Sequence, residues 1–256
     1  MEHVIQDLEK TGYEYRGSFN LLLHLGFRKR PPLTNVNLHV FEEGNPEIEL
    51  NLLFRDYLRA HPDALKEYEA LKLKLLSQEA SHKIIQGPFK GYTLEKDAFI
   101  KKTLDQAGFK GLCMRICTHH DEWESARTFR QKYFFDNVPI ADPYTWTFDH
   151  KDHAHLVLYK GTKIIGYTHI QLWPDCRAAL RIIVVDEEIR GQGLGGHFLS
   201  QCERWLKQKG FKVLQTQASP AAYPFYLKYG YHEMPFKDPD GHESDPQDTD
   251  MGKVLL

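Results

Sequence analysis

The stretch that most constrains the fold is RGQGLGG, residues 190–196, which lies between a β-branched run and an amphipathic segment. Its four glycines free the main chain at the point where a strand is expected to end and a helix to begin. Such a turn lets backbone N–H groups converge, and the helix N-terminus adds unsatisfied donors and a positive dipole end. The pattern predicts an anion site suited to a pyrophosphate, with Arg190 adding charge-assisted hydrogen bonds.

The spacing of the glycines separates the known phosphate-binding patterns. A dinucleotide fingerprint requires G-x-G-x-x-G, whereas the spacing here is G-x-G-x-G-G. A P-loop requires Lys and then Ser or Thr after its last glycine, but His197 and Phe198 follow here. The pattern that fits is R-x-x-G-x-G, formed by Arg190, Gly193 and Gly195.

The order of elements around this turn is equally informative. From residue 112 onward, hydrophobic periodicity and turn residues predict a strand (112–117), a helix (121–135), a hairpin (154–173), a strand (178–186), a helix (194–210), a strand (211–218), a short helix and two strands. The 194–210 helix carries its apolar stripe on Leu194, Phe198, Leu199, Cys202, Trp205 and Leu206, and Gly210 is expected to end it.

This order and three segments resemble the GCN5-related N-acetyltransferase (GNAT) superfamily. The segments are RIIVVDEEIRGQG, SPAAYPFYLKYGYHE and DTDMGKVL, and the resemblance runs from about residue 112 to the end. It implies an α/β (α+β) fold for residues 111–256, with a central mixed, mostly antiparallel sheet flanked by helices. It also implies acetyl-CoA as co-substrate.

The resemblance carries a set of site residues. Those implied to bind coenzyme A are Ile183, Val184, Val185, Arg190, Gly191, Gln192, Gly193, Leu194, Gly195, Gly196 and Ser219. The glycine-turn amides would hold the pyrophosphate, and the strand residues would hydrogen-bond the pantetheine arm. The N–H of Val185 is implied to stabilise the acetyl oxygen as it gains negative charge.

Catalysis by direct attack of an amine on the thioester needs two proton movements. Tyr226 stands at the position of the family's usual tyrosine acid. Many family members carry a glutamate base on the strand before the turn, but AALRIIVV offers only Arg181 there. His169 and Asp175 are the remaining candidates for a base acting through water. Ser219 also departs from the family, which often has Asn at that position.

The first half of the chain, residues 1–110, reads as a separate, smaller α+β domain with one or two strands and three helices. The segments PPLTNVNLHVFEEG, LLFRDYLRAHPDALKEYEALKLKLL and YTLEKDAFIKKTL resemble the C-terminal part of the GrpB-like family, whose fold is nucleotidyltransferase-like. The Gly-Ser turn and acidic strand residues of that family are missing ahead of TGYEYRG. The basic residues Arg28, Lys29, Arg30, Arg55 and Arg59 fit either a phosphate site or an exposed charged surface.

Composition excludes several classes of partner. A net charge of −2 gives no general reason to bind nucleic acid or an anionic membrane, and no apolar run reaches membrane-spanning length. The N-terminus lacks a signal-peptide core, and the four cysteines show no disulfide spacing. We expect a cytoplasmic protein with reduced thiols. A homodimer is an option that the sequence leaves open.

Two polar clusters carry alternative interpretations. The run DHKDHAH, residues 149–155, could ligate Zn²⁺, but a polar loop ahead of a strand accounts for it equally well, so we expect no metal. The acidic stretch 238–250 fits a solvated loop or a surface that attracts a cationic acceptor. The predicted function is transfer of acetyl from acetyl-CoA to a primary amine of a small molecule or peptide. The alternatives are a non-catalytic acyl-CoA sensor and nucleotidyl transfer by the first half.

Overall fold

The computed structural model describes residues 2–30, 35–86, 89–136, 141–241 and 245–255. The chain forms two compact units. One comprises Met1–His120 with Tyr159–Ile164, and the other comprises Asp121–Leu158 with Ile165–Leu256. The predicted domain boundary at residues 110 and 111 stays a prediction.

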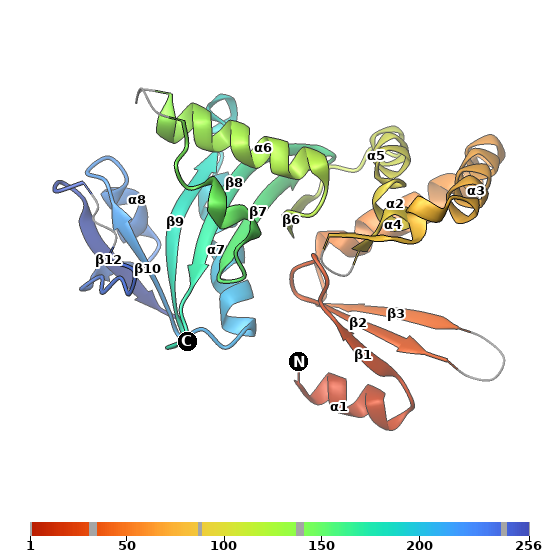
Figure 1. Ribbon diagram of the computed structural model, residues 1–256, viewed down its shortest axis with the longest axis horizontal. Helices are drawn as coiled ribbons and strands as arrows, with labels where there is room; N and C mark the ends of the chain where they lie inside the picture. The colour runs from red at the N-terminus through yellow and green to blue at the C-terminus, as the bar shows by residue number, and fades with distance from the viewer. Residues whose placement is uncertain (1, 31–34, 87–88, 137–140, 242–244, 256) are drawn as a thin grey trace. The chain divides into compact units, whose positions relative to one another are not determined.

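The first unit combines a small antiparallel sheet with a group of helices (Figure 1). Its elements are α1 (Glu2–Lys10), β1 (Glu14–Gly17), β2 (His24–Lys29), β3 (Val36–Phe41), α2 (Pro46–Ala60), α3 (Pro62–Ser77), β4 (Ile84–Gln86), β5 (Phe89–Lys90), α4 (Gly91–Leu94), α5 (Asp97–Gln106) and β6 (Leu112–Ile116). Helix α2 begins after Asn45, whose side chain accepts from the Glu47 N–H, and Pro46 occupies the first turn.

The sequence pattern indicated one or two strands in this unit, but the small sheet has three, in the order β1-β2-β3. Strand β2 is buried at four successive positions, so it shows no alternation of apolar and polar residues. Strand β1 spans only four residues. The short hairpin of β4 and β5 and helix α1 were also not predicted.

The second unit follows the predicted order of elements. Its elements are α6 (His120–Arg130), a π-helical turn η2 (Gln131–Phe135), a 3-10 turn η3 (Thr145–Asp149), β7 (His153–Lys160), β8 (Lys163–Leu172), β9 (Arg177–Val185), a 3-10 turn η4 (Glu187–Ile189), α7 (Leu194–Gln208), β10 (Val213–Ala218), α8 (Tyr223–Lys228), β11 (His232–Glu233) and β12 (Thr249–Val254). The large sheet has seven strands in the order β11-β12-β10-β9-β8-β7-β6.

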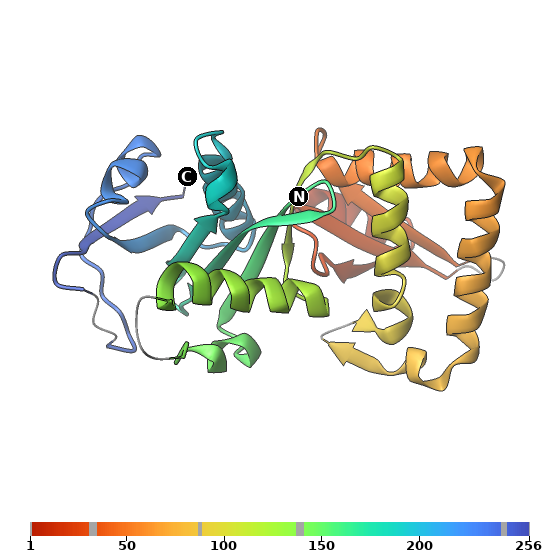
Figure 2. The ribbon, with the colours of Figure 1, turned by 90° about the horizontal axis from the view of Figure 1, so that it is seen from above.

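The strand pairing confirms a mixed, mostly antiparallel sheet. Among the described pairings, β9 and β10 run parallel, while β8–β9, β10–β12 and β11–β12 are antiparallel. Helices α6 and α7 lie on opposite faces of this sheet (Figure 2). The sheet therefore presents two separate surfaces on which a site can be built.

The predicted stripe of α7 is confirmed as the contact with the core. Its members Leu194, Phe198, Leu199, Cys202, Trp205 and Leu206 are all buried. The helix ends at Gln208, and Gly210 adopts the left-handed conformation of a C′ residue with φ of +86°.

The structure bears on two further features of the sequence, the lack of a membrane-spanning run and the state of the cysteines. None of the helices among the described residues combines the length and apolar character needed to cross a membrane. All four cysteines are free thiols; Cys113, Cys117 and Cys202 are buried and Cys176 is exposed.

Candidate functional site

The candidate site begins where two parallel strands diverge. The register of β9 with β10 runs from Arg177 opposite Val213 to Ala179 opposite Gln215. Beyond that point, β9 continues for six residues to Val185 without a described backbone pairing to β10. The C-terminal half of β9 therefore has one edge free, on the side where β10 has moved away.

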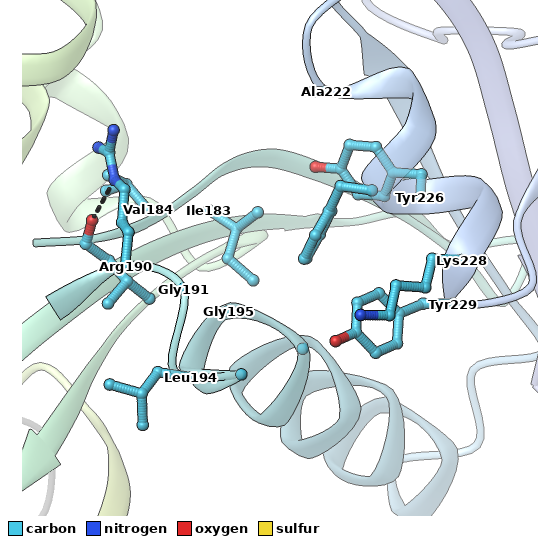
Figure 3. Close-up of a pocket in the computed structure, with 14 residues that line it drawn as sticks. Ile183, Val184, Arg190, Gly191, Leu194, Gly195, Ala222, Tyr226, Lys228 and Tyr229 are labelled. Carbon is cyan, nitrogen blue, oxygen red and sulfur yellow. Dashed lines mark hydrogen bonds between the residues drawn. The ribbon is translucent and has the colours of Figure 1, made fainter. Parts of the chain in front are cut away.

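A cavity of about 430 Å³ opens between this half of β9, the glycine turn and α8. The strand contributes Ile183, Val184 and Val185; the turn and the start of α7 contribute Arg190, Gly191, Gly193, Leu194, Gly195 and Gly196. Helix α8 and the residues beside it contribute Ala222, Phe225, Tyr226, Lys228 and Tyr229 (Figure 3).

The glycine turn directs backbone amides at this cavity. Gly191 and Gly193 have φ of +81° and +77°, a left-handed conformation that a side chain disfavours. Gly193 is also the N-cap of α7, and no side chain caps this helix. The first-turn N–H groups are thus left for a ligand, and the helix dipole makes their end positive. The arrangement is suited to a phosphate group.

Two cationic side chains line the cavity from opposite sides. Arg190 lies beside β9, where its Nε donates to the carbonyl oxygen of Val185 at 3.1 Å. Lys228 extends from α8 beside Tyr229 (Figure 3). Cations on both sides of an amide-lined turn raise the local positive potential, which favours a ligand that carries several negative charges.

The N–H of Val185 faces the open edge of β9. Gly166 of β8 lies opposite Val185, and the N–H of Asp186 donates to the oxygen of Ile165 at 2.9 Å. Because hydrogen-bonded and non-hydrogen-bonded pairs alternate in an antiparallel ladder, the polar groups of Val185 point away from β8. The predicted oxyanion donor is thus directed to the side where β10 has diverged.

Tyr226 reaches the same cavity from α8 and is 6% exposed. Burial raises the pKa of Tyr226 to about 12, and a hydrogen bond with Thr216 opposes that rise. The phenol therefore keeps its proton throughout the neutral pH range. The Thr216 hydroxyl itself donates to the Leu180 oxygen at 3.0 Å, at the point where β9 and β10 separate.

The structure brings together most of the residues predicted from the sequence. Two of them, Gln192 and Ser219, are exposed and do not line the cavity. Instead, the Ser219 backbone carbonyl oxygen accepts hydrogen bonds from the N–H groups of Ala222 and Tyr223, both at 2.9 Å, and so supports the start of α8.

Sequence reasoning missed Ala222, Phe225, Lys228 and Tyr229 as lining residues. For the two aromatic residues, the sequence did hold a signal. The spacing within PFYLKYG places Phe225, Tyr226 and Tyr229 on one short helix and its C-cap. Gly196 explains why Tyr229 belongs there, because a Cβ at Gly196 would lie 1.8 Å from the Tyr229 hydroxyl. Only glycine permits this close approach of α7 to α8.

Neither candidate base is placed for that role. Asp175 is exposed in a turn, where its carboxylate accepts from Arg177 Nε at 2.6 Å. His169 is buried and lines a second, separate cavity. Burial, and then the charges of neighbouring groups, hold the pKa of His169 well below its usual value, which makes it a weak proton acceptor.

The polar run 149–155 contributes to a cluster of stacked imidazoles. His155 lies 4.4 Å from His169 and His153 lies 5.1 Å from it, between ring centroids. Burial lowers the pKa of His153 to about 4 and that of His155 to about 3. Among the described residues, no group of three or more His, Cys, Asp or Glu side chains is placed to hold a metal ion.

The neutral cluster predicts acid sensitivity. We expect the free energy of unfolding of the second unit to fall by about 3 kcal/mol between pH 6.5 and 5, because His155 and His169 each gain a proton only on unfolding. Their folded-state pKa values lie below those of the unfolded chain, so this stability is present above pH 6.5 and is lost as the pH falls.

Urea unfolding followed by tryptophan fluorescence measures this effect. The reporters all lie in the second unit: Trp123, Trp146, Trp173 and Trp205. Replacing the exposed His232 by Asn provides a control and should leave the pH dependence unchanged. A free energy that stays level over this pH range would contradict the neutral cluster.

The basic residues of the first unit interact with their neighbours. Arg55 Nε donates to Asp56 at 2.8 Å, and Lys29 Nζ donates to the Thr11 oxygen at 2.7 Å. Arg28 Nε donates to Asn37 at 3.3 Å. These contacts favour the interpretation of an exposed charged surface.

Comparison with known proteins reproduces the division seen in the sequence. Residues 1–106 match the family model described as GrpB protein, and residues 119–231 match that of the Acetyltransferase (GNAT) family. The UPF0157 protein YqkA of Bacillus subtilis is 36% identical over 104 residues, which are 40% of this chain and 28% of that protein. The chain thus spans less than a third of this curated relative.

Two solved structures align with somewhat more than half of the chain. An acetyltransferase of the GNAT family from Staphylococcus aureus Mu50 is 15% identical, with a TM-score of 0.47, and covers 57% of this chain and 100% of its own. The PaiA N-acetyltransferase of Thermoplasma acidophilum, in complex with coenzyme A, is 16% identical, with a TM-score of 0.41 and coverages of 56% and 99%. The family models thus match the two parts of the chain that carry the resemblances, residues 1–106 for GrpB and residues 119–231 for the GNAT family, and confirm both resemblances.

Proposed function

We propose that the second unit transfers an acetyl group from acetyl-CoA to a primary amine by direct attack in a ternary complex. The observation that carries the proposal is the cavity between β9, the glycine turn and α8. The cavity combines the uncapped N–H groups at the start of α7, the cations Arg190 and Lys228, and the edge of β9 that is not paired with β10. The match of residues 119–231 to the GNAT family supports the same assignment.

The residues present fit coenzyme A as a ligand. The N–H groups at the start of α7, with Arg190 and Lys228, suit its linked phosphates. The backbone groups of Ile183 and the N–H of Val185, which face the free edge of β9, suit its peptide-like arm, since an amide chain pairs with a free strand edge. Acetyl-CoA supplies the activated thioester.

Within this site, the Val185 N–H donates a hydrogen bond to the carbonyl oxygen as negative charge develops on it. A nitrogen–carbon bond forms and the carbon–sulfur bond breaks, while the amine releases one proton to water and the departing thiolate takes one proton from water. Tyr226 donates a hydrogen bond to the departing sulfur. A thiol has a pKa of about 8.5, so full transfer from a phenol with a pKa of about 12 is uphill. Tyr226 therefore stabilises the thiolate chiefly as a donor.

Two measurements on the full chain test the proposal. Calorimetric titration with CoA is expected to show binding, and a panel of primary amines is expected to release free thiol from acetyl-CoA. Binding without thiol release from any amine would favour a CoA-sensing module instead. Absence of CoA binding would contradict the placement of the site.

A further inference from the structure

A second cavity, of about 320 Å³, lies in the second unit and contacts β9 immediately before the first one. Arg181 and Ile182 line it, whereas Ile183, Val184 and Val185 line the first cavity. Gln217 of β10 lines it too, so both diverging strands contribute to its wall. The two cavities are therefore lined by successive residues of β9, near the divergence of β9 and β10.

The mouth of this second cavity is aromatic. Phe134, Phe135, Tyr144 and Trp146 all line it. Trp146 is 50% exposed, and Phe134 and Tyr144 are each 42% exposed. Half-exposed aromatic side chains gathered at one opening are typical of a binding site for an apolar or aromatic group.

Hydrogen bonds fix the position of the proton on His153, which lines the cavity. Arg130 Nη1 can only donate, so at 3.3 Å it makes His169 Nδ1 an acceptor. His169 must then carry its proton on Nε2, which donates to His153 Nδ1 at 2.8 Å. His153 in turn carries its proton on Nε2. Because that atom has no hydrogen-bond partner among the described residues, its N–H is left for a ligand.

Arg181 supplies a second donor. Its Nε and Nη2 donate to the Gln171 side-chain oxygen at 3.0 and 2.6 Å, and Nη2 also contacts Asp238. Its Nη1 has no hydrogen-bond partner within the described part of the chain. Arg181 and His153 thus line the same cavity, and each carries an N–H group without a hydrogen-bond partner among the described residues.

The neighbouring carboxylates do not line this cavity. Asp238 pairs with Arg181, Asp240 accepts from Gln171, and Asp142 pairs with Arg130. Of the acidic loop, Asp250 also accepts from Gln217 at 3.2 Å. Among the described lining residues, a cationic acceptor such as a polyamine would find donors and aromatic rings but no carboxylate.

We propose that the second cavity binds the acceptor, and that this acceptor is an amine carrying both an aromatic or large apolar group and a carboxylate. The carboxylate accepts from Arg181 Nη1 and His153 Nε2, and the apolar group packs against the aromatic mouth. This inference rests on the proposed acetyl transfer. With acetyl-CoA in the first cavity and the acceptor in the second, the amine would approach the thioester where β9 and β10 diverge.

Thiol release from acetyl-CoA tests the inference with matched pairs of amines. Phenylalanine is compared with phenethylamine and tryptophan with tryptamine, because each pair differs only in the carboxylate. Spermidine serves as the polycation. We expect kcat/KM to be at least about 10-fold higher for the amino acid of each pair, which is the effect of losing one well-placed charged partner.

Arg181→Gln is expected to remove this preference by lowering kcat/KM for the amino acids at least about 10-fold while leaving the decarboxylated amines unchanged. Arg181→Lys keeps the positive charge but lacks the paired N–H groups of the guanidinium. Its kcat/KM for the amino acids should lie between those of the wild type and Arg181→Gln. Arg177→Gln is the control, because Arg177 lies on the same strand, pairs with Asp175 and does not line the cavity.

The outcomes separate this inference from the proposed function. Equal rates for both members of each pair, or spermidine as the preferred acceptor, overturn the inference while acetyl transfer stands. The same holds if CoA binds but no carboxylate-bearing amine binds or reacts. Loss of CoA binding itself would overturn the proposed function.

Discussion

Replacing Gly193 by valine is expected to weaken CoA binding at least about 100-fold, a loss of about 2.7 kcal/mol in binding free energy. Gly193 has φ of +77°, and a β-branched residue is strongly disfavoured there. The turn must therefore relax, which redirects the first-turn amides of α7. A Cβ at this position would meet no atom within 4 Å, so the fold should persist. Calorimetric titration with CoA measures the change.

The other end of the same helix offers a matched control. Gly210 has φ of +86°, and a Cβ added there would also meet no atom within 4 Å. Gly210→Val thus imposes similar backbone strain on α7 but lies away from the cavity. Both variants should lose similar thermal stability, and only the Gly193 variant should lose CoA affinity. Equal affinities in the two variants would contradict the assigned anion site.

Tyr226→Phe is expected to lower kcat about 10- to 100-fold, near the lower limit for loss of a proton donor. Burial raises the pKa of Tyr226 to about 12, so the hydroxyl contributes a hydrogen bond rather than a facile proton. The KM for acetyl-CoA should change little, because the hydroxyl acts on sulfur as charge develops. Steady-state thiol release separates kcat from KM.

The raised pKa of Tyr226 also predicts the pH profile of the proposed acetyl transfer. Tyr226 stays protonated below a pH of about 12. We therefore expect the rate of thiol release to be retained as the pH rises from about 7 to about 10. Tyr231→Phe is the control for loss of a buried hydroxyl, since Tyr231 lies 5.3 Å from Tyr226 between ring centroids but does not line the cavity. A similar loss of kcat in both variants would assign the effect to packing.

The glycine turn could be predicted from the sequence because its chemistry is local. Positive φ values at Gly191 and Gly193 and an uncapped helix start follow from the run RGQGLGG alone. The stripe of α7 was equally readable, since its period is set by the helix itself. Strand β2 was not predicted, because its two faces are both buried and the alternation that marks a strand is absent.

The second cavity could not be predicted in the same way. Its walls come from residues between Arg130 and Gln217, which only the folded sheet brings together. His169 illustrates the difficulty: its sequence position suggested a base, but its pKa depends on burial beside Arg130 and two other imidazoles. Lys228 was likewise missed because its place in the first cavity depends on how α8 packs on α7.

The contact between Gly196 and the Tyr229 hydroxyl has a mechanical consequence for the enzyme. The turn that faces the anion and the helix that bears Tyr226 meet there with no spare room, since even one methyl group would collide with that hydroxyl. A displacement of the first turn of α7 toward α8 would therefore press on the Tyr229 side chain. If coenzyme A binds as proposed, the placement of its phosphates and the placement of the Tyr226 hydroxyl would be linked through this one contact.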